Sequence, residues 1–417
     1  MADSNPFAAA AASTPPRLEQ VQELESRVLM RTYERIPLLA VEGKGPWLYD
    51  ADGRRYLDFL AGIAVNALGY AHPRITRVLR DQGRRLIHLS NLYYHDYQGQ
   101  LAERLNRLAG MERAFFANSG AEAIETAIKL ARLHGRTITP DKFELVALEN
   151  SFHGRTLGAL SITGQPKYRQ PYEPLLPGVR FVPLNDGNRL REAVNERTCA
   201  IIVESIQGEG GVFPAEPAFL QLAADLAREH RALLIFDEIQ CGLGRTGKWF
   251  AFQATTVVPD LVTLAKPIAA GFPLSCVLGR GPAATLFQPG MHGTTFGGGP
   301  LACRLALEFL DIVEEDHLLE NVQTMGNLLM EGLENIVRRH AQATTVRGRG
   351  LILALQLDRP ARPVVEQARE MGLLINATHD SVVRLLPPYI IEARHVRQAL
   401  KVLSRALRTV ARGQKAS

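Results

Sequence analysis

An acidic and a basic side chain each stand directly behind a short apolar run in the middle of the sequence. Asp237 closes the run 233–236, and Lys266 follows the run 261–265. Continuous apolar runs of this length are typical of parallel strands that are buried on both faces. Ligands of open α/β sheets lie beyond the carboxyl ends of such strands. We therefore expect Asp237 and Lys266 to face one crevice.

These two groups suit one cofactor in particular. A carboxylate can hold a protonated pyridine nitrogen, and a lysine amine can form a Schiff base with an aldehyde. Both are what pyridoxal phosphate (PLP) requires of a protein. Acids are nevertheless common at strand ends, and a lysine after a strand is usually a solvated loop charge. The pair alone leaves both interpretations open.

A second stretch has the features of an anion site. The run 114–117 predicts a strand, Ser119 and Gly120 predict a turn, and a helix is expected to follow. The free N–H groups and the positive end of that helix would meet at Gly120 and Ala121, where a phosphate could bind. The alternative is an ordinary N-cap formed by Ser119, with Glu122 in the first helical turn.

Two further loops carry polar groups behind predicted strands. Strand 144–148 leads to Phe152 and Arg155. An aromatic ring there can stack on a flat ligand, and an arginine can bind a carboxylate through two hydrogen bonds. A packed phenylalanine and a surface arginine are the alternative. Strand 198–204 leads to a glycine-rich loop with one acid, Glu209.

Composition narrows the class of protein. The 417 residues are 46% hydrophobic and 22% charged, and the net charge of +5 comes from scattered Lys and Arg, which indicates no nucleic-acid surface. The four cysteines form no CxxC pair and the 11 histidines do not cluster, so we expect no disulfide framework, no metal site and a reducing cytoplasm. No apolar run is long enough to span a membrane.

Several ordered stretches give the chain a family likeness. From about Arg35 to the C terminus it resembles the class III aminotransferases of PLP fold type I. Each stretch is a weak signal alone, but their order is specific. The stretches are residues 61–69 (AGIAVNALG), 118–123 (NSGAEA), 152–155 (FHGR), 207–211 (QGEGG), 236–242 (FDEIQCG), 244–247 (GRTG), 265–266 (AK) and 293–298 (GTTFGG).

The resemblance implies an α/β fold and a domain organisation. Residues 73–310 would form a large PLP-binding domain around a mostly parallel sheet. Residues 18–72, with a helix over 18–35, would join residues 311–417 in a smaller α+β domain. Residues 1–17, rich in Ala, Ser and Pro, are expected to be a disordered tail. The family further implies a homodimer with shared active sites.

The resemblance also implies a role for each matching residue. Lys266 would form the Schiff base, and Asp237 would hold the pyridine N–H. The remaining cofactor contacts would be Gln240 on the phenolic oxygen, Phe152 on the ring face, Ser119, Gly120 and Ala121 on the phosphate, and Thr295 on the phosphate of the neighbouring subunit. Arg155 would hold the substrate α-carboxylate, with Thr294 nearby.

Some positions depart from the family pattern. Ala121 stands where relatives usually have Thr, which removes a side-chain contact to phosphate but keeps the backbone N–H. Tyr70 replaces His, and Pro267 follows the lysine where relatives have Ala. None of these changes removes the acid, the lysine or the arginine.

Two features bear on the substrate. The family pairs Glu209 with Arg384, and we expect this pair to open when glutamate replaces a donor with a terminal amine, although a purely structural ion pair is the alternative. Related ornithine aminotransferases have a Tyr at the position of Ile63, whose hydroxyl can meet a free α-amine. Leaving that ammonium unpaired beside an apolar Ile63 costs on the order of several kcal/mol. We therefore expect N-acetylornithine as amine donor and 2-oxoglutarate as acceptor.

Other functions stay open on the sequence alone. Ornithine, N-succinylornithine, 4-aminobutyrate or a carrier-linked lysine precursor could be the donor. A decarboxylase or an aminomutase could use the same fold. A non-enzymatic binding or regulatory relative is disfavoured because every charged group that the chemistry needs is present.

Overall fold

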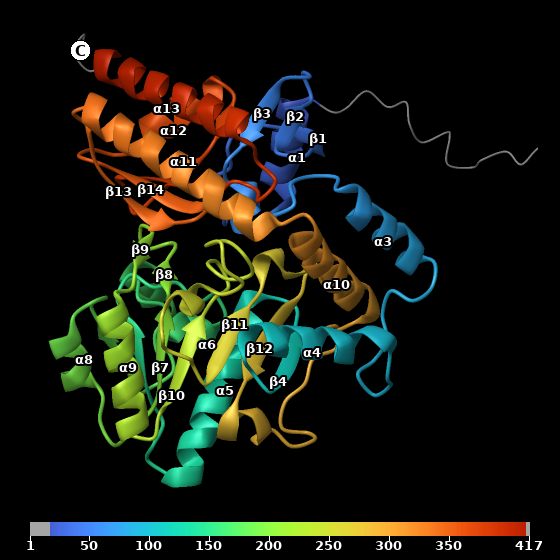
Figure 1. Ribbon diagram of the computed structural model, residues 1–417, viewed down its shortest axis with the longest axis vertical. Coiled ribbons are helices and arrows are strands. Elements are labelled where there is room, and N and C mark those ends of the chain that lie inside the picture. The colour runs from blue at the N-terminus through green and yellow to red at the C-terminus, as the bar shows by residue number, and fades with distance from the viewer. Residues whose placement is uncertain (1–16, 414–417) are drawn as a thin grey trace, which may run out of the picture.

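Seven strands form the central sheet of the computed structural model, which describes residues 17–413 (Figure 1). The strand order is β4-β12-β11-β10-β7-β5-β6. Within this sheet β12 runs antiparallel to its neighbours and the other pairs are parallel, so the expected mostly parallel sheet is confirmed. The strands are β4 (Arg113–Ala117), β5 (Glu144–Leu148), β6 (Val179–Val182), β7 (Thr198–Glu204), β10 (Leu233–Asp237), β11 (Leu261–Leu264) and β12 (Ser275–Gly279).

Helices cover both faces of the central sheet because its inner strands are apolar on both sides. Along β10, Ile235 packs in a cluster with residues of α5, whereas Phe236 packs on the opposite face in a cluster with residues of α9. This alternation explains why the strand is a continuous apolar run in the sequence. The helices that pack against the strands of this sheet are α4 (Asp96–Ala109), α5 (Gly120–Ile138), α8 (Gly187–Ala193) and α9 (Pro217–Glu229); α10 (Pro300–Glu315) packs on α4, and α3 (Pro73–Gly83) packs on α10.

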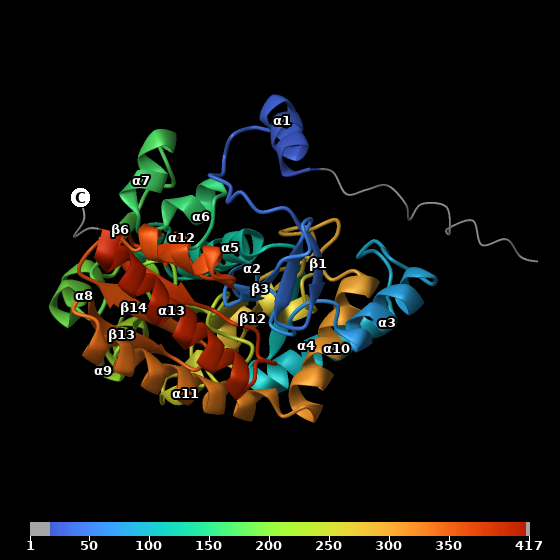
Figure 2. The same ribbon diagram turned by 90° about the horizontal axis from the view of Figure 1, so that it is seen from above.

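The two ends of the chain meet in a second layer. β3 pairs in parallel with β15, so strands from both ends share one sheet with β1 and β2. Another sheet, β13-β14-β17-β16, is antiparallel and is covered by α11, α12 and α13, as the expected α+β character requires (Figures 1 and 2). The elements are β1 (Ala40–Lys44), β2 (Trp47–Asp50), β3 (Arg55–Asp58), β13 (Ala343–Arg349), β14 (Ile352–Leu357), β15 (Leu373–Leu374), β16 (Asn376–Thr378), β17 (Val382–Leu385), α11 (Leu318–Arg339), α12 (Arg362–Glu370) and α13 (Ala393–Gly413).

The N-terminal helix is shorter than its pattern predicts. α1 spans Leu18–Val28 rather than residues 18–35, and none of its residues is buried. Figure 2 shows this helix apart from the rest of the chain. A helix that buries no apolar face gains little from packing, so its apolar spacing alone does not extend it. Residues 1–16 of the expected tail lie outside the described residues, and no helix within residues 17–413 is long and apolar enough to cross a membrane.

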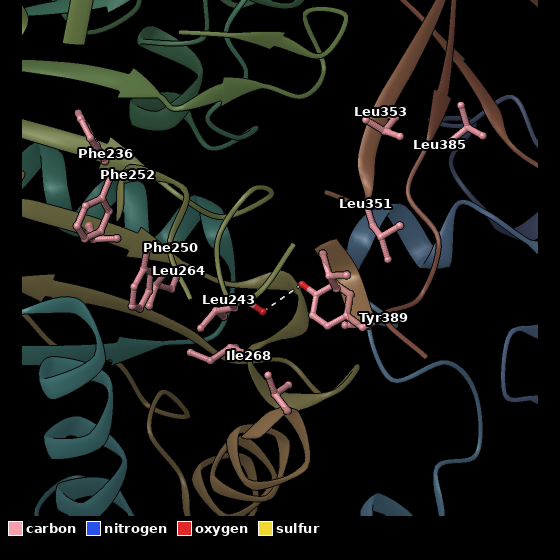
Figure 3. Packing of buried hydrophobic residues seen from close by; sticks show 14 of the residues in the cluster. Phe236, Leu243, Phe250, Phe252, Leu264, Ile268, Leu351, Leu353, Leu385 and Tyr389 are labelled. Carbon is pink, nitrogen blue, oxygen red and sulfur yellow. Dashed lines mark hydrogen bonds between the residues drawn. The ribbon is translucent and has the colours of Figure 1, made fainter. Parts of the chain in front are cut away.

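One hydrophobic cluster joins the central sheet to the layer above it (Figure 3). Phe236 and Leu264 enter the cluster from the central sheet, and Leu353 enters it from β14. Tyr389 packs in the same cluster, and its hydroxyl donates to the carbonyl oxygen of Leu243 at 3.1 Å. The two layers therefore share one core, and residues from both can contribute to a site between them.

Candidate active site

Residues that follow five strands line one cavity at the carboxyl edge of the central sheet. Because β12 reverses direction between β4 and β11, strand β4 runs parallel to β11, β10, β7 and β5, and the carboxyl ends of all five strands share this edge. The cavity holds about 390 Å³, which is within the range of small-molecule sites. The predicted residues that line it are Ser119, Gly120, Ala121, Phe152, Arg155, Glu209, Asp237, Gln240 and Lys266.

Asp237 is held rigidly at the floor of this cavity. Its Oδ2 lies 2.7 Å from His153 Nδ1, and its Oδ1 accepts from Thr263 Oγ1 and the Ile239 N–H, both at 3.1 Å. The carboxylate is almost fully buried. Since a carboxylate oxygen can accept more than one hydrogen bond, Asp237 can still hold a cationic N–H in the cavity.

Two buried residues beside Asp237 were not singled out from the sequence. His153 lies in the FHGR stretch, but a histidine that contacts an acid 84 positions away has no local signal. Glu204 lies opposite Asp237 in the register of β7 and β10 and accepts from the Phe152 N–H at 3.2 Å. Burial and the charge of Asp237 raise the pKa of Glu204 well above its ordinary value, which favours the neutral acid.

Lys266 presents its amine from a strained turn. Its φ is +45°, in the left-handed region, and it begins a short 3₁₀ helix whose next residue is Pro267. Burial lowers the pKa of Lys266 below its ordinary 10.5, although the charges of Glu209 and Asp237 oppose the shift. A lowered pKa increases the fraction of neutral amine, which is the nucleophilic form.

The start of α5 combines the two alternatives that the sequence left open. Ser119 is the N-cap, and its Oγ accepts from the Glu122 N–H at 3.3 Å while Glu122 Oε2 accepts from the Ser119 N–H at 2.8 Å. The N–H groups of Gly120 and Ala121 have no acceptor within residues 17–413 and line the cavity. A Cβ on Gly154 would lie 2.9 Å from the Cβ of Ala121, so glycine is needed for this close approach. Capping therefore leaves two donors for an anion.

Glu209 and Arg384 form an ion pair across the two layers. Arg384 Nη1 donates to Glu209 Oε1 at 2.6 Å, and Arg384 is fully buried while Glu209 keeps 28% of its side chain exposed. Arg384 Nη1 also lies 3.0 Å from the Gly208 carbonyl oxygen and 3.2 Å from Gln240 Oε1, whereas its Nη2 has no partner within the described residues. Although burial opposes it, the charge of Arg384 lowers the pKa of Glu209.

Four predicted residues are not among those that line the cavity of their own chain: Arg384, Thr294, Thr295 and Ile63. Thr294 Oγ1 accepts from Asn118 Nδ2 and from the Gly297 N–H, both at 3.2 Å. Thr295 is exposed, and Ile63 is 41% exposed. Val65, two residues after Ile63, lines the cavity instead. Exposure of this kind cannot be read from a local apolar pattern.

The cavity has the complementary groups that PLP requires. Two free N–H groups at Gly120 and Ala121 suit its phosphate, Asp237 suits a cationic ring nitrogen, and Phe152 offers an aromatic face. Arg155 lies beside Phe152, with its guanidinium 3.8 Å from the ring centroid of Tyr168, a neighbour that the sequence did not indicate. No group of three side chains that could hold a metal ion occurs among the described residues.

Comparisons with known proteins agree with this arrangement. The class-III aminotransferase family model matches residues 28–407. The acetylornithine aminotransferase of Aquifex aeolicus is 45% identical over 380 residues, which cover 91% of this chain and 99% of that protein. The acetylornithine aminotransferase of Methanocaldococcus jannaschii is 43% identical over 382 residues, which cover 91% of this chain and 96% of that protein.

Solved structures show the same fold. The ornithine aminotransferase of Toxoplasma gondii, whose structure has PLP at partial occupancy, matches with a TM-score of 0.94 and 32% identity and covers both chains completely. The acetylornithine aminotransferase of Elizabethkingia anophelis matches with a TM-score of 0.84 and 30% identity, over 94% of this chain and 99% of that chain.

Proposed function

The chain belongs to the class-III aminotransferases, and from that premise we propose that it transfers the terminal amine of N-acetylornithine to 2-oxoglutarate. It is a PLP-dependent aminotransferase of PLP fold type I. The products are N-acetylglutamate semialdehyde and glutamate, a step of arginine biosynthesis. The observation that carries the proposal is the convergence of Lys266, Asp237 and Glu209 on one cavity, with Arg384 buried against Glu209.

The side chains around the cavity have different roles in the reaction. Bound PLP supplies an aldehyde that condenses with the substrate amine and a ring that takes up electrons from the substrate carbon. Lys266 Nζ would be the amine that the substrate displaces, and it would then carry a proton from the reacting substrate carbon to the cofactor carbon. Asp237 keeps a proton on the ring nitrogen, and His153 and Thr263 keep Asp237 in position.

The remaining contacts divide between cofactor and substrate. Gly120 and Ala121 donate backbone N–H groups to the phosphate, Phe152 stacks on the ring, and Gln240 hydrogen-bonds the phenolic oxygen. Ser119 contributes by capping α5, which supports these donors. Arg155 binds the α-carboxylate of N-acetylornithine.

The Glu209–Arg384 pair allows one cavity to accept two different substrates. N-acetylornithine brings no carboxylate next to its reacting carbon, so Glu209 covers Arg384. Glutamate brings its α-carboxylate there, and the partly exposed Glu209 swings away to free the guanidinium. The unpartnered Nη2 of Arg384 supports this role, because it gives the incoming carboxylate a second donor.

The protein acts as a homodimer in this proposal. Large apolar side chains are exposed at 92–94 and at Phe296, and Tyr94 and Leu92 are among the most exposed. Contiguous apolar surface of this kind marks a protein–protein contact. Thr295, which lies outside its own cavity, then binds the phosphate of the partner subunit, with Thr294 beside it. A fully active monomer in size-exclusion chromatography would contradict this arrangement.

Compartment and domain boundaries complete the proposal. The four cysteines are free and buried, which suits a reducing cytoplasm. In this proposal residues 73–310 form the large domain and residues 18–72 join residues 311–417 in the small one, of which 414–417 lie outside the described residues. The contact between β3 and β15 supports this division, because it joins both ends of the chain.

Substrate choice is tested by comparing kcat/KM across N-acetylornithine, N-succinylornithine, ornithine, lysine and 4-aminobutyrate. We expect N-acetylornithine to be best because apolar Ile63 cannot pair with the free α-amine of ornithine. Ornithine is the second candidate, because the ornithine aminotransferase of Toxoplasma gondii superposes with a TM-score of 0.94 and Ile63 does not line the cavity of its own chain. A higher kcat/KM for ornithine would reassign the substrate.

A further inference from the structure

Four consecutive residues between β3 and the cavity have left-handed backbones. The φ values of Ala61, Gly62, Ile63 and Ala64 are +49°, +62°, +60° and +66°. Side chains with a Cβ disfavour this region, and a β-branched residue such as Ile63 is a strong outlier there. A run of this kind persists only where the surrounding structure holds it.

Asp58 holds the entry to this turn. Its Oδ1 accepts from the N–H groups of Leu60 and Ala61, at 2.8 and 3.0 Å. Inside the turn, the Ala64 N–H donates to Leu60 at 3.1 Å and the Asn66 N–H donates to Ala61 at 2.8 Å. The turn is therefore closed by its own amides and anchored through one buried carboxylate.

Tyr70 fixes the position of Asp58. Its hydroxyl donates to Asp58 Oδ2 at 2.5 Å. The Tyr70 backbone exchanges two hydrogen bonds with Gly45, and a Cβ on Gly43 would lie 2.5 Å from the Tyr70 ring. The ring is therefore fixed against β1, and its hydroxyl is aimed at the carboxylate. Tyr70 stands where related chains usually have His.

The turn contributes to the wall of two cavities. Val65, which follows it, lines the cavity that contains Lys266. Gly62, within it, lines a neighbouring cavity of about 520 Å³ together with Asp58 and Tyr70. A shift of the turn would move Val65 and Ile63 with respect to the bound substrate.

We propose that Asp58 and Tyr70 are positioning residues that hold residues 61–64 in the left-handed turn and so set the fit of the amine donor against Val65. This proposal rests on the proposed function. The donor is affected more than the acceptor, because N-acetylornithine is the longer substrate and carries an acyl group that 2-oxoglutarate lacks.

The test compares Tyr70→Phe with a matched control in the same sheet. Tyr56 donates to Asp50 Oδ2 at 2.8 Å and has no hydrogen bond to the turn, so Tyr56→Phe removes an equivalent contact elsewhere. In the holoenzyme, hydrogen exchange measured by mass spectrometry should be about tenfold faster over residues 60–66 in Tyr70→Phe, and unchanged there in Tyr56→Phe.

Kinetics supply the second readout. Tyr70→Phe should raise the KM for N-acetylornithine about tenfold and leave the KM for 2-oxoglutarate and the visible absorbance of bound PLP nearly unchanged. If the wild type prefers another donor, the proposed substrate is wrong and the comparison is repeated with that donor.

Three results would overturn the positioning role. The first is unchanged exchange over residues 60–66 in Tyr70→Phe. The second is an equal rise of the KM for donor and acceptor. The third is the same effect from Tyr56→Phe, which would indicate general destabilisation of the sheet.

Discussion

Replacement of Glu209 by Ala separates the two half-reactions. In the proposed switch Glu209 covers Arg384 when the donor has no carboxylate next to its reacting carbon. Without Glu209, the buried guanidinium has no counter-charge during the first half-reaction, although it keeps hydrogen bonds to Gly208 and Gln240. During the second half-reaction the α-carboxylate of glutamate takes the same place, so the loss of Glu209 costs little.

The magnitude follows from the geometry of the pair. Arg384 Nη1 and Glu209 Oε1 are 2.6 Å apart. A hydrogen bond to a charged group contributes about 1.5–3 kcal/mol. Since 28% of the Glu209 side chain is exposed, we take a value in the lower half of that range, about 2 kcal/mol, which corresponds to about a 30-fold change. Arg384 keeps its hydrogen bond to Gly208, so the variant should fold.

Stopped-flow spectroscopy of each half-reaction measures the effect. The second-order rate constant for the half-reaction with N-acetylornithine should fall about 30-fold in Glu209→Ala. The second-order rate constant for the half-reaction with glutamate should change less than about threefold. Glu209→Gln is the matched control, because it keeps the size of the side chain and a hydrogen-bond acceptor but removes the charge. Its rate constant with N-acetylornithine should lie between those of the wild type and Glu209→Ala. An equal loss in both half-reactions would refute the switch and leave a structural ion pair.

Three other changes have defined outcomes. Apo protein with Lys266→Met should be more stable to urea than the apo wild type at pH 7. Burial lowers the pKa of Lys266, so the folded state binds the proton of this lysine less well than the unfolded chain does. The difference in the free energy of unfolding should shrink as the pH rises towards 10.5. Asp237→Asn should lower kcat by about 100-fold or more in steady-state assays, because a preorganised charge is lost. His153→Leu should lower kcat by only about tenfold, since Asp237 loses one donor but keeps Thr263. A larger loss of kcat in His153→Leu than in Asp237→Asn would contradict the predicted ranking of the two residues.

Much of the fold could be predicted because its signals are local. The runs that became β5 and β7 are strands with the predicted bounds, and β10 extends the predicted run 233–236 by one residue to Asp237, since each run fills the buried length of one strand. β12 was missed, although it reverses direction between β4 and β11 and so brings the end of β4 to the active edge. Strand direction depends on pairing between distant segments, which no local pattern records.

The candidate site divides in the same way. Lys266, Asp237 and Phe152 could be singled out because each follows a recognisable strand. His153 and Glu204 could not, because their importance comes from contact with Asp237.

The sequence by itself determined which chemical groups stand at the ends of which strands, and hence the class of cofactor and the family. Only the tertiary structure decided how those groups meet. The family resemblance indicated that Glu209 pairs with Arg384, and the tertiary structure fixes the geometry of that pair, in which Arg384 is fully buried. It also holds Ile63 in a left-handed turn whose neighbour Val65 lines the cavity in its place. The physical reason is that residue type and strand length are local properties, whereas ion pairs and strained turns persist only through contacts between distant segments.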